Sequence, residues 1–147
     1  MEVYDADQST ASSLTNISTR GFVGSGQNAM IGGLISAGNG GFTKLIVRAL
    51  GPTLSQLNVP NVLTDPVLEL RDANGVLLAS NDNWADTQQA DIQASGYAPP
   101  NNRESAIVVT RPSTNTTAIV RGKNGRPATL WSKFTRCRNR RRSSTPT

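Results

Sequence analysis

The chain contains no histidine and one cysteine, and these two counts limit the catalysis that its side chains could perform. Without histidine, Ser–His and Cys–His nucleophilic systems and histidine-ligated zinc are excluded. Cys137 lies among arginines, which could make its thiol reactive, but an inert or mistranslated residue is the simpler interpretation. Asp82, Asp86 and Asp91 could do acid–base work, yet capping and solubility explain them. The sequence therefore predicts that the protein is not an enzyme.

Oxygen-bearing side chains near two turns could bind a hard cation such as calcium. The candidate metal ligands are Asp72, Asn74 and Asp82. The first of these turns lacks the later glutamate of an EF-hand loop, and Asp and Asn are also ordinary turn formers. Calcium binding and turn formation are both kept as interpretations, and no other cofactor is predicted.

Trp84 directly follows three polar residues and is the candidate ligand-binding aromatic residue. An exposed tryptophan beside polar side chains can stack on a sugar ring, which would place it in a carbohydrate site. A tryptophan also has the volume to close a hydrophobic core, and we favour this second interpretation.

The segment that must position these residues, Asp65–Trp84, has the pattern of a β-hairpin. Apolar and polar residues alternate over residues 68–71, as in a strand with one face in water. Asn74-Gly75 supplies residues that adopt left-handed backbone angles, so the chain can reverse there. A second strand, expected to be more buried, follows at residues 76–79.

The rest of the chain predicts further strands and one short helix. Strands are expected over residues 14–19, 22–23, 29–36, 43–50, 105–110 and 117–121. The 29–36 strand is expected to be buried, with a bulge or a close backbone approach at Gly32-Gly33. A bend or bulge is expected at Arg20-Gly21, and residues 53–64 are expected to be irregular. The helix is predicted near residues 86–95, with Asp86 as N-cap or first-turn acid and Gly96 as its stop. About eight strands without βαβ alternation indicate an all-β fold, an antiparallel β-sandwich or jelly-roll-like domain.

Positive charge is concentrated at the C-terminus. Residues 125–147 carry seven Lys and Arg and no acid, whereas residues 1–124 carry eight basic and ten acidic groups, a net charge of −2. We therefore expect a single β-sandwich domain at 1–124 and a basic tail at 125–147. The tail is either a genuine disordered segment or a frameshift product. In favour of the latter, allowed codons for Leu130–Arg136 read Val-Val-Glu-Val-Tyr-Glu in a neighbouring frame, which nearly repeats Glu2-Val3-Tyr4.

Two further classes of function find no support in the sequence. No apolar run is long enough to span a bilayer, and no signal peptide is visible at the N-terminus. The arginines of residues 136–142 could bind phosphates non-specifically, but no nucleic-acid-binding motif accompanies them. We predict neither membrane insertion nor a specific nucleic-acid partner.

Several phrases together resemble a repeated β-sandwich domain of large secreted or surface-anchored proteins of environmental bacteria. The phrases are LIVRALGPTL (45–54), DPVLELRDANG (65–75), SNDNW (80–84), YAPPNNRESAIV (97–108) and TAIVRGKNG (117–125). Residues 1–6, which contain EVYDA, look like the closing strand of such a repeat, whereas the expected Gly-x-x-Leu-Val-Glu-Val-Tyr-Asp phrase is missing after Gly125. In outline the family is similar to the pre-peptidase-like modules found at the C-termini of secreted peptidases.

This resemblance implies a non-catalytic structural or adhesive module that is a piece of a longer polypeptide, secreted or located at the cell surface. Its partners would be neighbouring repeats or domains, and surface glycans are a further candidate. The alternative function is a carbohydrate- or calcium-binding accessory domain of a secreted hydrolase.

Overall fold

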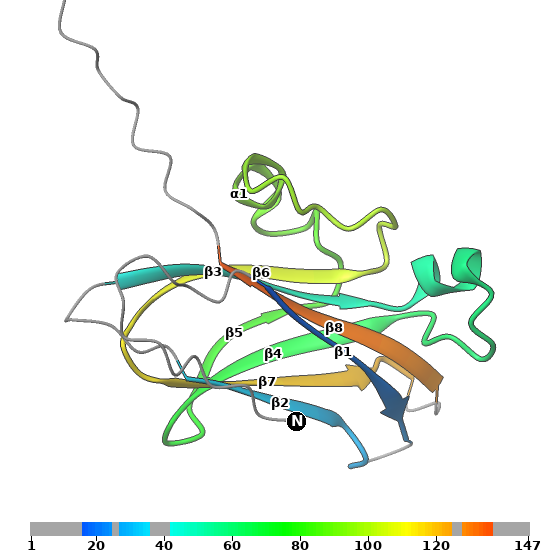
Figure 1. Ribbon diagram of the computed structural model, residues 1–147, viewed down its shortest axis with the longest axis horizontal. Helices are drawn as coiled ribbons and strands as arrows, with labels where there is room; N and C mark the ends of the chain where they lie inside the picture. The colour runs from blue at the N-terminus through cyan, green and yellow to red at the C-terminus, as the bar shows by residue number, and fades with distance from the viewer. Residues whose placement is uncertain (1–15, 25–26, 36–41, 125–127, 137–147) are drawn as a thin grey trace, which may run out of the picture.

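Eight antiparallel strands form two four-stranded sheets that pack face to face (Figure 1). The computed structural model describes residues 16–24, 27–35, 42–124 and 128–136. The predicted all-β, antiparallel sandwich is confirmed. In chain order its elements are β1 (Asn16–Val23), β2 (Met30–Ile35), β3 (Phe42–Leu50), the 3₁₀-helix η1 (Pro52–Leu57), β4 (Pro66–Asp72), β5 (Leu77–Asn81), α1 (Gln89–Ala94), β6 (Ser105–Pro112), β7 (Asn115–Gly122) and β8 (Ala128–Arg136).

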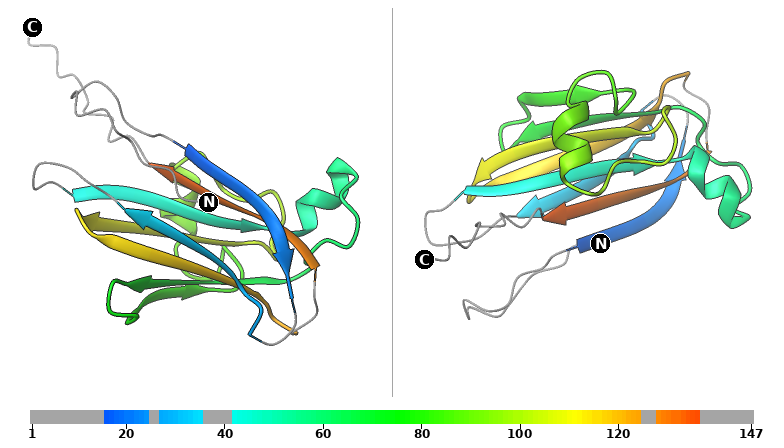
Figure 2. Two further views of the ribbon diagram at one scale, coloured as in Figure 1. Left: turned by 60° about the horizontal axis from the view of Figure 1, so that its bottom comes forward. Right: turned by 90° about the horizontal axis from the view of Figure 1, so that it is seen from above.

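The order of the strands leaves each sheet with two edges. The first sheet, called sheet A here, has the order β1-β8-β3-β6, and the second, sheet B, has the order β2-β7-β4-β5. Edge strands β1 and β2 contact each other on one side of the sandwich, and edge strands β5 and β6 contact each other on the other side (Figure 2). The sandwich therefore has a β1/β2 side and a β5/β6 side.

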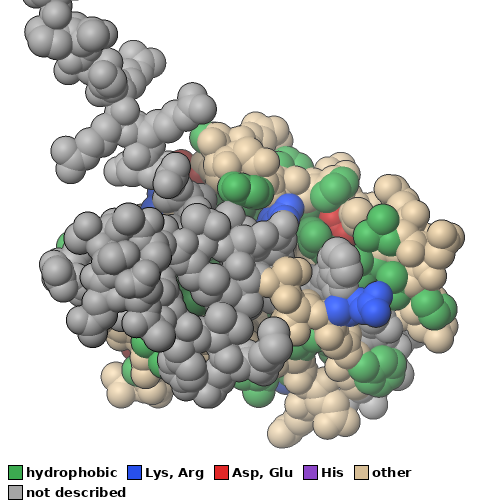
Figure 3. All heavy atoms as spheres, in the orientation of Figure 1, with side chains coloured by type: hydrophobic (Ala, Val, Ile, Leu, Met, Phe, Trp, Pro, Cys, Tyr) green, Lys and Arg blue, Asp and Glu red, His purple; other side chains and the backbone are tan. Residues whose placement is uncertain are grey.

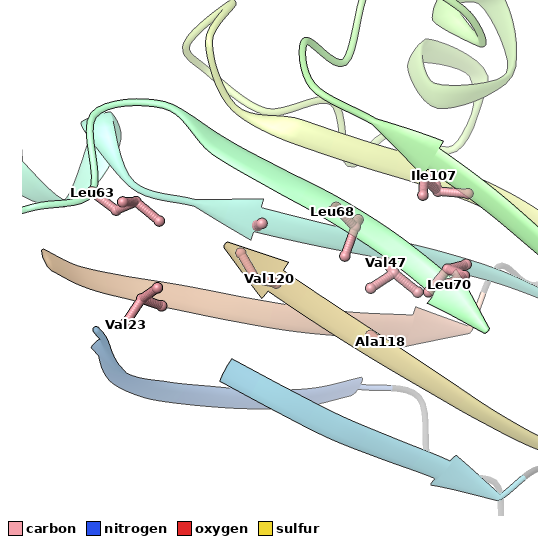
Figure 4. Packing of buried hydrophobic residues seen from close by; sticks show 9 residues of the cluster. Val23, Val47, Leu63, Leu68, Leu70, Ile107, Ala118 and Val120 are labelled. Carbon is pink, nitrogen blue, oxygen red and sulfur yellow. The ribbon is translucent and has the colours of Figure 1, made fainter. Parts of the chain in front are cut away.

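The main hydrophobic core lies between the two sheets. In β4, fully buried Leu68 and Leu70 alternate with half-buried Glu69 and Arg71, because successive residues of a strand point to opposite faces. Burying a leucine side chain contributes roughly 1.5–3 kcal/mol to folding. Figure 4 shows how side chains of both sheets meet in this layer, which comprises Val23, Val47, Ala49, Leu63, Leu68, Leu70, Ile107, Ala118 and Val120.

A second, smaller core lies on the outer face of sheet A. Ile46 of β3 and Val108 of β6 alternate with the main-core residues of those strands, so they point away from sheet B. Trp84 and Ile92 of the β5–β6 connection pack on them. Figure 1 shows α1 lying over this end of sheet A, and β6 is consequently buried on both faces over its first four residues.

The hairpin of β4 and β5 confirms the turn prediction. Gly75 has a φ of 81°, and the Asp72 carboxylate accepts hydrogen bonds from the backbone N–H groups of Asn74 and Val76, each at 2.9 Å. The expectation of a more buried second strand is wrong, since Leu77 is largely exposed. The reason is the position of β5 at a sheet edge, which local sequence does not encode.

Two expectations about the first strands are also wrong. β1 pairs continuously with β8 through Arg20-Gly21, so it has no bulge there. β2 pairs continuously with β7 through Gly32-Gly33, without a bulge, and alternates between half-buried and exposed residues instead of being buried. An apolar run such as MIGGLI predicts a strand, but its burial depends on whether both neighbouring positions in the sheet are filled.

The connections differ from the sequence prediction in detail. α1 begins at Gln89, and its N-cap is Gln88 without a side-chain cap bond, so Asp86 is not the cap. The predicted stop is confirmed by Gly96, whose φ is 78°. The stretch expected to be irregular includes η1, which has a proline in its first turn. Among the described residues, no helix has the length and apolar character needed to span a membrane.

The predicted tail contains a strand that belongs to the sandwich. Ala128–Arg136 forms β8, which lies between β1 and β3 and pairs with both. Nine residues that the sequence assigns to the basic tail are therefore paired as a strand of sheet A. The physical reason is that Thr, Trp and Phe favour strands, whereas the prediction rested on the charge of the whole segment. Residues 1–6, 125–127 and 137–147 lie outside the described residues, and with them the predicted closing strand and Cys137.

Candidate functional site

Trp84 is a core residue in this fold. Its side chain is 8% exposed and packs with Ile46, Ile92, Ala106 and Val108 on the outer face of sheet A. Its backbone N–H donates to the Glu104 carbonyl oxygen at 2.8 Å, which closes the β5–β6 connection. A sugar-stacking platform needs an exposed ring face, so the burial of Trp84 favours the packing interpretation.

The three candidate calcium ligands do not converge. Asp72 and Asn74 lie at the turn of the β4–β5 hairpin, where Asp72 Oδ1 already accepts two backbone hydrogen bonds. Asp82 follows β5 at the opposite end of the same hairpin. No group of three or more acidic, histidine or cysteine residues suited to a metal occurs within the described part of the chain. Turn formation is thus the role that the geometry gives to Asp72.

Asp82 instead faces a second carboxylate that sequence reasoning missed. Asp65, which precedes β4, lies close to Asp82, and the Oδ1 atom of each is buried without a hydrogen-bond partner. Partial burial, and next the neighbouring Asp82 carboxylate, raise the pKa of Asp65. Lys123, which follows β7, donates from Nζ to Asp82 Oδ2 at 2.5 Å and from its backbone N–H to the Asp65 carbonyl at 2.9 Å.

This Asp65–Asp82–Lys123 cluster is already partly neutralised from within the chain. The Lys123 ammonium occupies a position on Asp82 that a cation would take, and the hydrogen bond to Asp82 raises the pKa of Lys123. Calcium needs six to eight oxygen ligands, and two carboxylates supply too few by themselves. The cluster joins the start of β4 to the ends of β5 and β7.

A buried pair of opposite charges anchors the β5–β6 connection. Glu104 is fully buried, and its carboxylate accepts hydrogen bonds from the Thr53 N–H and hydroxyl, both at 2.8 Å, and from the Asn101 N–H at 3.2 Å. Arg48 donates to the Tyr97 carbonyl at 3.0 Å, and its guanidinium lies 5.8 Å from the centre of the Tyr97 ring. Burial lowers the pKa of Arg48, and the charge of Glu104 offsets part of this effect. Because the Glu104 carboxylate is committed to Thr53 and Asn101, this pair is structural, and Arg48 Nε is buried without a hydrogen-bond partner.

The β5/β6 side of the sandwich is closed by side-chain amides. Gln88 pairs with the backbone of Val108 in β6: its Nε2 donates to the carbonyl oxygen at 2.8 Å, and its Oε1 accepts from the N–H at 2.9 Å. Asn81 Oδ1 accepts from the Ala106 N–H at 3.0 Å. These amides take the place of a further strand along β6. The neighbouring edge strand β5 has five residues and pairs with β4 through a register shift, two features that protect an edge.

On the β1/β2 side, β1 carries the exposed Arg20, whereas the described residues of β2 show none of these protective features. β2 has one strand neighbour, β7, and contains no charged residue and no proline. Ile31 and Ile35 on its outer face are 67% and 58% exposed, and Phe22 of β1 is 66% exposed. An unprotected edge with exposed apolar side chains is a template for pairing with another strand. We take the open edge, defined as Met30–Ile35 of β2, as the candidate functional site.

On the face shown in Figure 3, the coloured Lys, Arg, Asp and Glu side chains appear singly among polar and apolar atoms. The exposed large apolar residues of the described chain are Phe22, Ile31, Ile35, Phe42, Leu57, Val76, Leu77 and Tyr97. Sequence reasoning missed the open edge because it placed β2 in the interior. The signal that could have indicated this edge is the absence of Lys, Arg, Asp, Glu and Pro from Met30–Ile35.

Comparison with known proteins found no match, neither to a protein-family model nor to a curated protein.

Proposed function

We propose that the chain is a non-catalytic structural or adhesive module of an extracellular or cell-surface bacterial protein. In this function the sandwich serves as a rigid unit, and the open edge of β2 docks a neighbouring repeat or domain. The resemblance of about residues 1–125 to a repeated surface domain supports the location and the repeat context.

One observation carries the proposal, namely the unequal treatment of the two sides of the sandwich. On the β5/β6 side, Gln88 and Asn81 satisfy the backbone groups of an edge strand with their own amides. On the β1/β2 side, the edge strand β2 presents Ile31 and Ile35 to solvent and no charge. Charged residues on an edge strand hinder pairing with another chain. Their absence from β2 fits a strand that pairs with a strand of a neighbouring repeat or domain.

A second function, a calcium-binding accessory domain of a secreted hydrolase, is favoured by the Asp65–Asp82 pair. Two carboxylates that face each other, each with a buried oxygen lacking a hydrogen-bond partner, would gain from a cation between them. Lys123 weighs against this function because it already bonds Asp82.

The two functions can be separated by thermal unfolding of the whole chain. A docking module should melt at the same temperature in about 5 mM calcium as in chelator, because Lys123 already bonds Asp82 and two carboxylates supply too few ligands for calcium. It should also give no signal against a polysaccharide panel. A calcium-dependent rise in melting temperature that is lost in Asp82→Asn, with Asp72→Asn as the matched control, would instead favour the accessory domain.

A positive test uses two copies of the chain joined by a flexible linker. If each copy docks its neighbour, the joined pair should melt at a higher temperature than the single chain, since a linker gives an effective concentration of about millimolar. Independent melting of the two copies, at the temperature of the single chain, would contradict docking between repeats.

A further inference from the structure

The open edge differs from the other three edges of the sandwich in ways that decide which strand it can accept. β6 has its amide partners, and β5 is short and shifted in register. β1 carries Arg20, an exposed residue in the middle of the strand. β2 alone combines regular pairing, apolar side chains and no charge along its described residues. A strand that pairs with β2 should therefore be uncharged and apolar on the same face.

The strand of this chain that meets this requirement best is β2 itself. We propose that β2 pairs antiparallel with β2 of a second copy of the chain, so that the two B sheets become one continuous sheet. This inference rests on the proposed docking function and names the partner and the register. Pairing of a strand with itself about a two-fold axis forms a closed, isologous contact, which adds no further copies.

The alternation of side chains limits the register of this pair. Ile31, Gly33 and Ile35 share the outer face of sheet B, and the half-buried Met30, Gly32 and Leu34 share the inner face. Opposed residues in a continuous sheet lie on the same face, so odd-numbered residues must oppose odd-numbered residues. Placing Gly33 on the axis sets Ile31 of each copy opposite Ile35 of the other. This register alone pairs both exposed isoleucines of β2 completely.

Gly33 suits the position on the axis. A Cβ atom built at Gly33 meets no atom within 4 Å, and the residue does not have a positive φ. The glycine is thus not required by the packing of a single copy or by its own backbone angles. It leaves the outer surface of the composite sheet open where the two copies meet, between two isoleucine pairs.

The size of the contact predicts weak association. A single six-residue edge contributes less surface than the roughly 800 Å² per partner of a stable complex. We therefore expect free chains to pair only near millimolar concentration, and linked copies to pair because the linker supplies that concentration.

Disulfide trapping tests the register directly. In a Cys137→Ser background, Gly33→Cys should form a disulfide-linked dimer under mild oxidation, because residues opposed on the axis have Cα atoms about 4.5–5.5 Å apart. Ile31→Cys and Ile35→Cys should each form no disulfide alone. In this register each residue lies four residues along the strand, or about 13 Å, from the same residue of the second copy. An equimolar mixture of the last two variants should give the mixed dimer.

Charge substitutions test the same register without a covalent bond. Gly33→Lys places two ammonium groups opposite each other and should weaken dimerisation by roughly fivefold or more. Dimerisation is measured by sedimentation at about 1 mM, and the melting temperature of the dilute chain should stay unchanged. Ile31→Lys should abolish the dimer, and adding Ile35→Glu to the same chain should restore it through two Lys–Glu pairs.

The outcomes separate this inference from the function on which it rests. A monomer at about 1 mM together with no disulfide trapping of Gly33→Cys overturns pairing through β2. If linked copies still stabilise each other in that case, docking stands and uses another surface. Trapping of Ile31→Cys alone would overturn the register, because it would require Ile31 on the axis.

Discussion

Replacing Gln88 by alanine should destabilise the sandwich by removing the amide that closes β6. The two hydrogen bonds of Gln88 with Val108, at 2.8 and 2.9 Å, satisfy one N–H and one C=O of a buried residue. Leaving a buried polar group without a partner costs about 1–3 kcal/mol, and water can replace part of this at a half-buried edge. We expect a loss of about 2 kcal/mol in the free energy of unfolding, and a melting temperature lower by roughly 8 °C.

Gln88→Glu makes the prediction more specific. One oxygen of the introduced carboxylate can still accept from the Val108 N–H, but the other faces the Val108 carbonyl oxygen, and two acceptors repel. The folded state should therefore keep the introduced carboxyl group protonated, so that its pKa rises above the unfolded value of about 4.3. The variant should be at least as unstable as Gln88→Ala at pH 7 and should recover as the pH falls through the raised pKa.

Urea unfolding followed by tryptophan fluorescence measures both variants, with Gln89→Ala as the control. Gln89 is the exposed first residue of α1 and has no hydrogen bond to β6, so its replacement should change stability by less than about 0.5 kcal/mol. Stability of Gln88→Ala within that range would refute a role of the amide in closing the edge. The same conclusion would follow if Gln88→Glu matched the wild type at pH 7.

Three further substitutions test other contacts by the same unfolding assay. Glu104→Gln should cost about 1–3 kcal/mol, because one amide oxygen cannot accept all the hydrogen bonds of the buried carboxylate; wild-type stability would contradict this. Since the pKa of Asp65 is raised, its contribution to stability falls as pH rises from the unfolded pKa of about 3.9 through the folded one. At pH values above the folded pKa, Asp65→Asn should therefore raise the free energy of unfolding by on the order of 0.5–1 kcal/mol, because it ends the repulsion with Asp82. An increase confined to lower pH would refute this. Gly51→Ala should prevent folding or cost more than about 3 kcal/mol, because its methyl would lie 1.8 Å from the Leu63 carbonyl oxygen; a folded, equally stable variant would show that this approach is not tight.

The parts of the fold that are determined by residues close together in the sequence could be predicted from it. Asn74-Gly75 encodes its own turn, because the glycine reaches φ 81° without strain and Asp72 lies near enough to bond the turn backbone. Alternation over residues 68–71 likewise gives the correct inner face of β4. In both cases the information lies within about four residues.

The errors concern what lies beside a strand in space. The apolar residues of β2 predict a buried strand, yet burial also requires a strand on each side, and among the described residues β2 has only β7 beside it. β8 was missed because arginines further along the chain dominated the charge of its segment.

The candidate site was beyond local reasoning for the same reason. Gln88 meets Val108 across twenty residues, and Asp65 meets Asp82 across seventeen, so no spacing rule connects either pair. The open edge is defined by the lack of such a partner, and that becomes visible only when all the strands are placed. Trp84 was correctly favoured as a core residue because its volume alone argues for burial.

The short β5 strand, which pairs with β4 through a register shift, limits how many copies can add to sheet B. Once β2 has acquired a strand, the outermost strands of the enlarged sheet B are β5 at both ends, and β5 is a poor template for further addition. Growth toward a cross-β fibre would need a flat edge at each end, and this composite sheet has none. A pair of chains joined through β2 would therefore offer no regular edge of sheet B to a third copy.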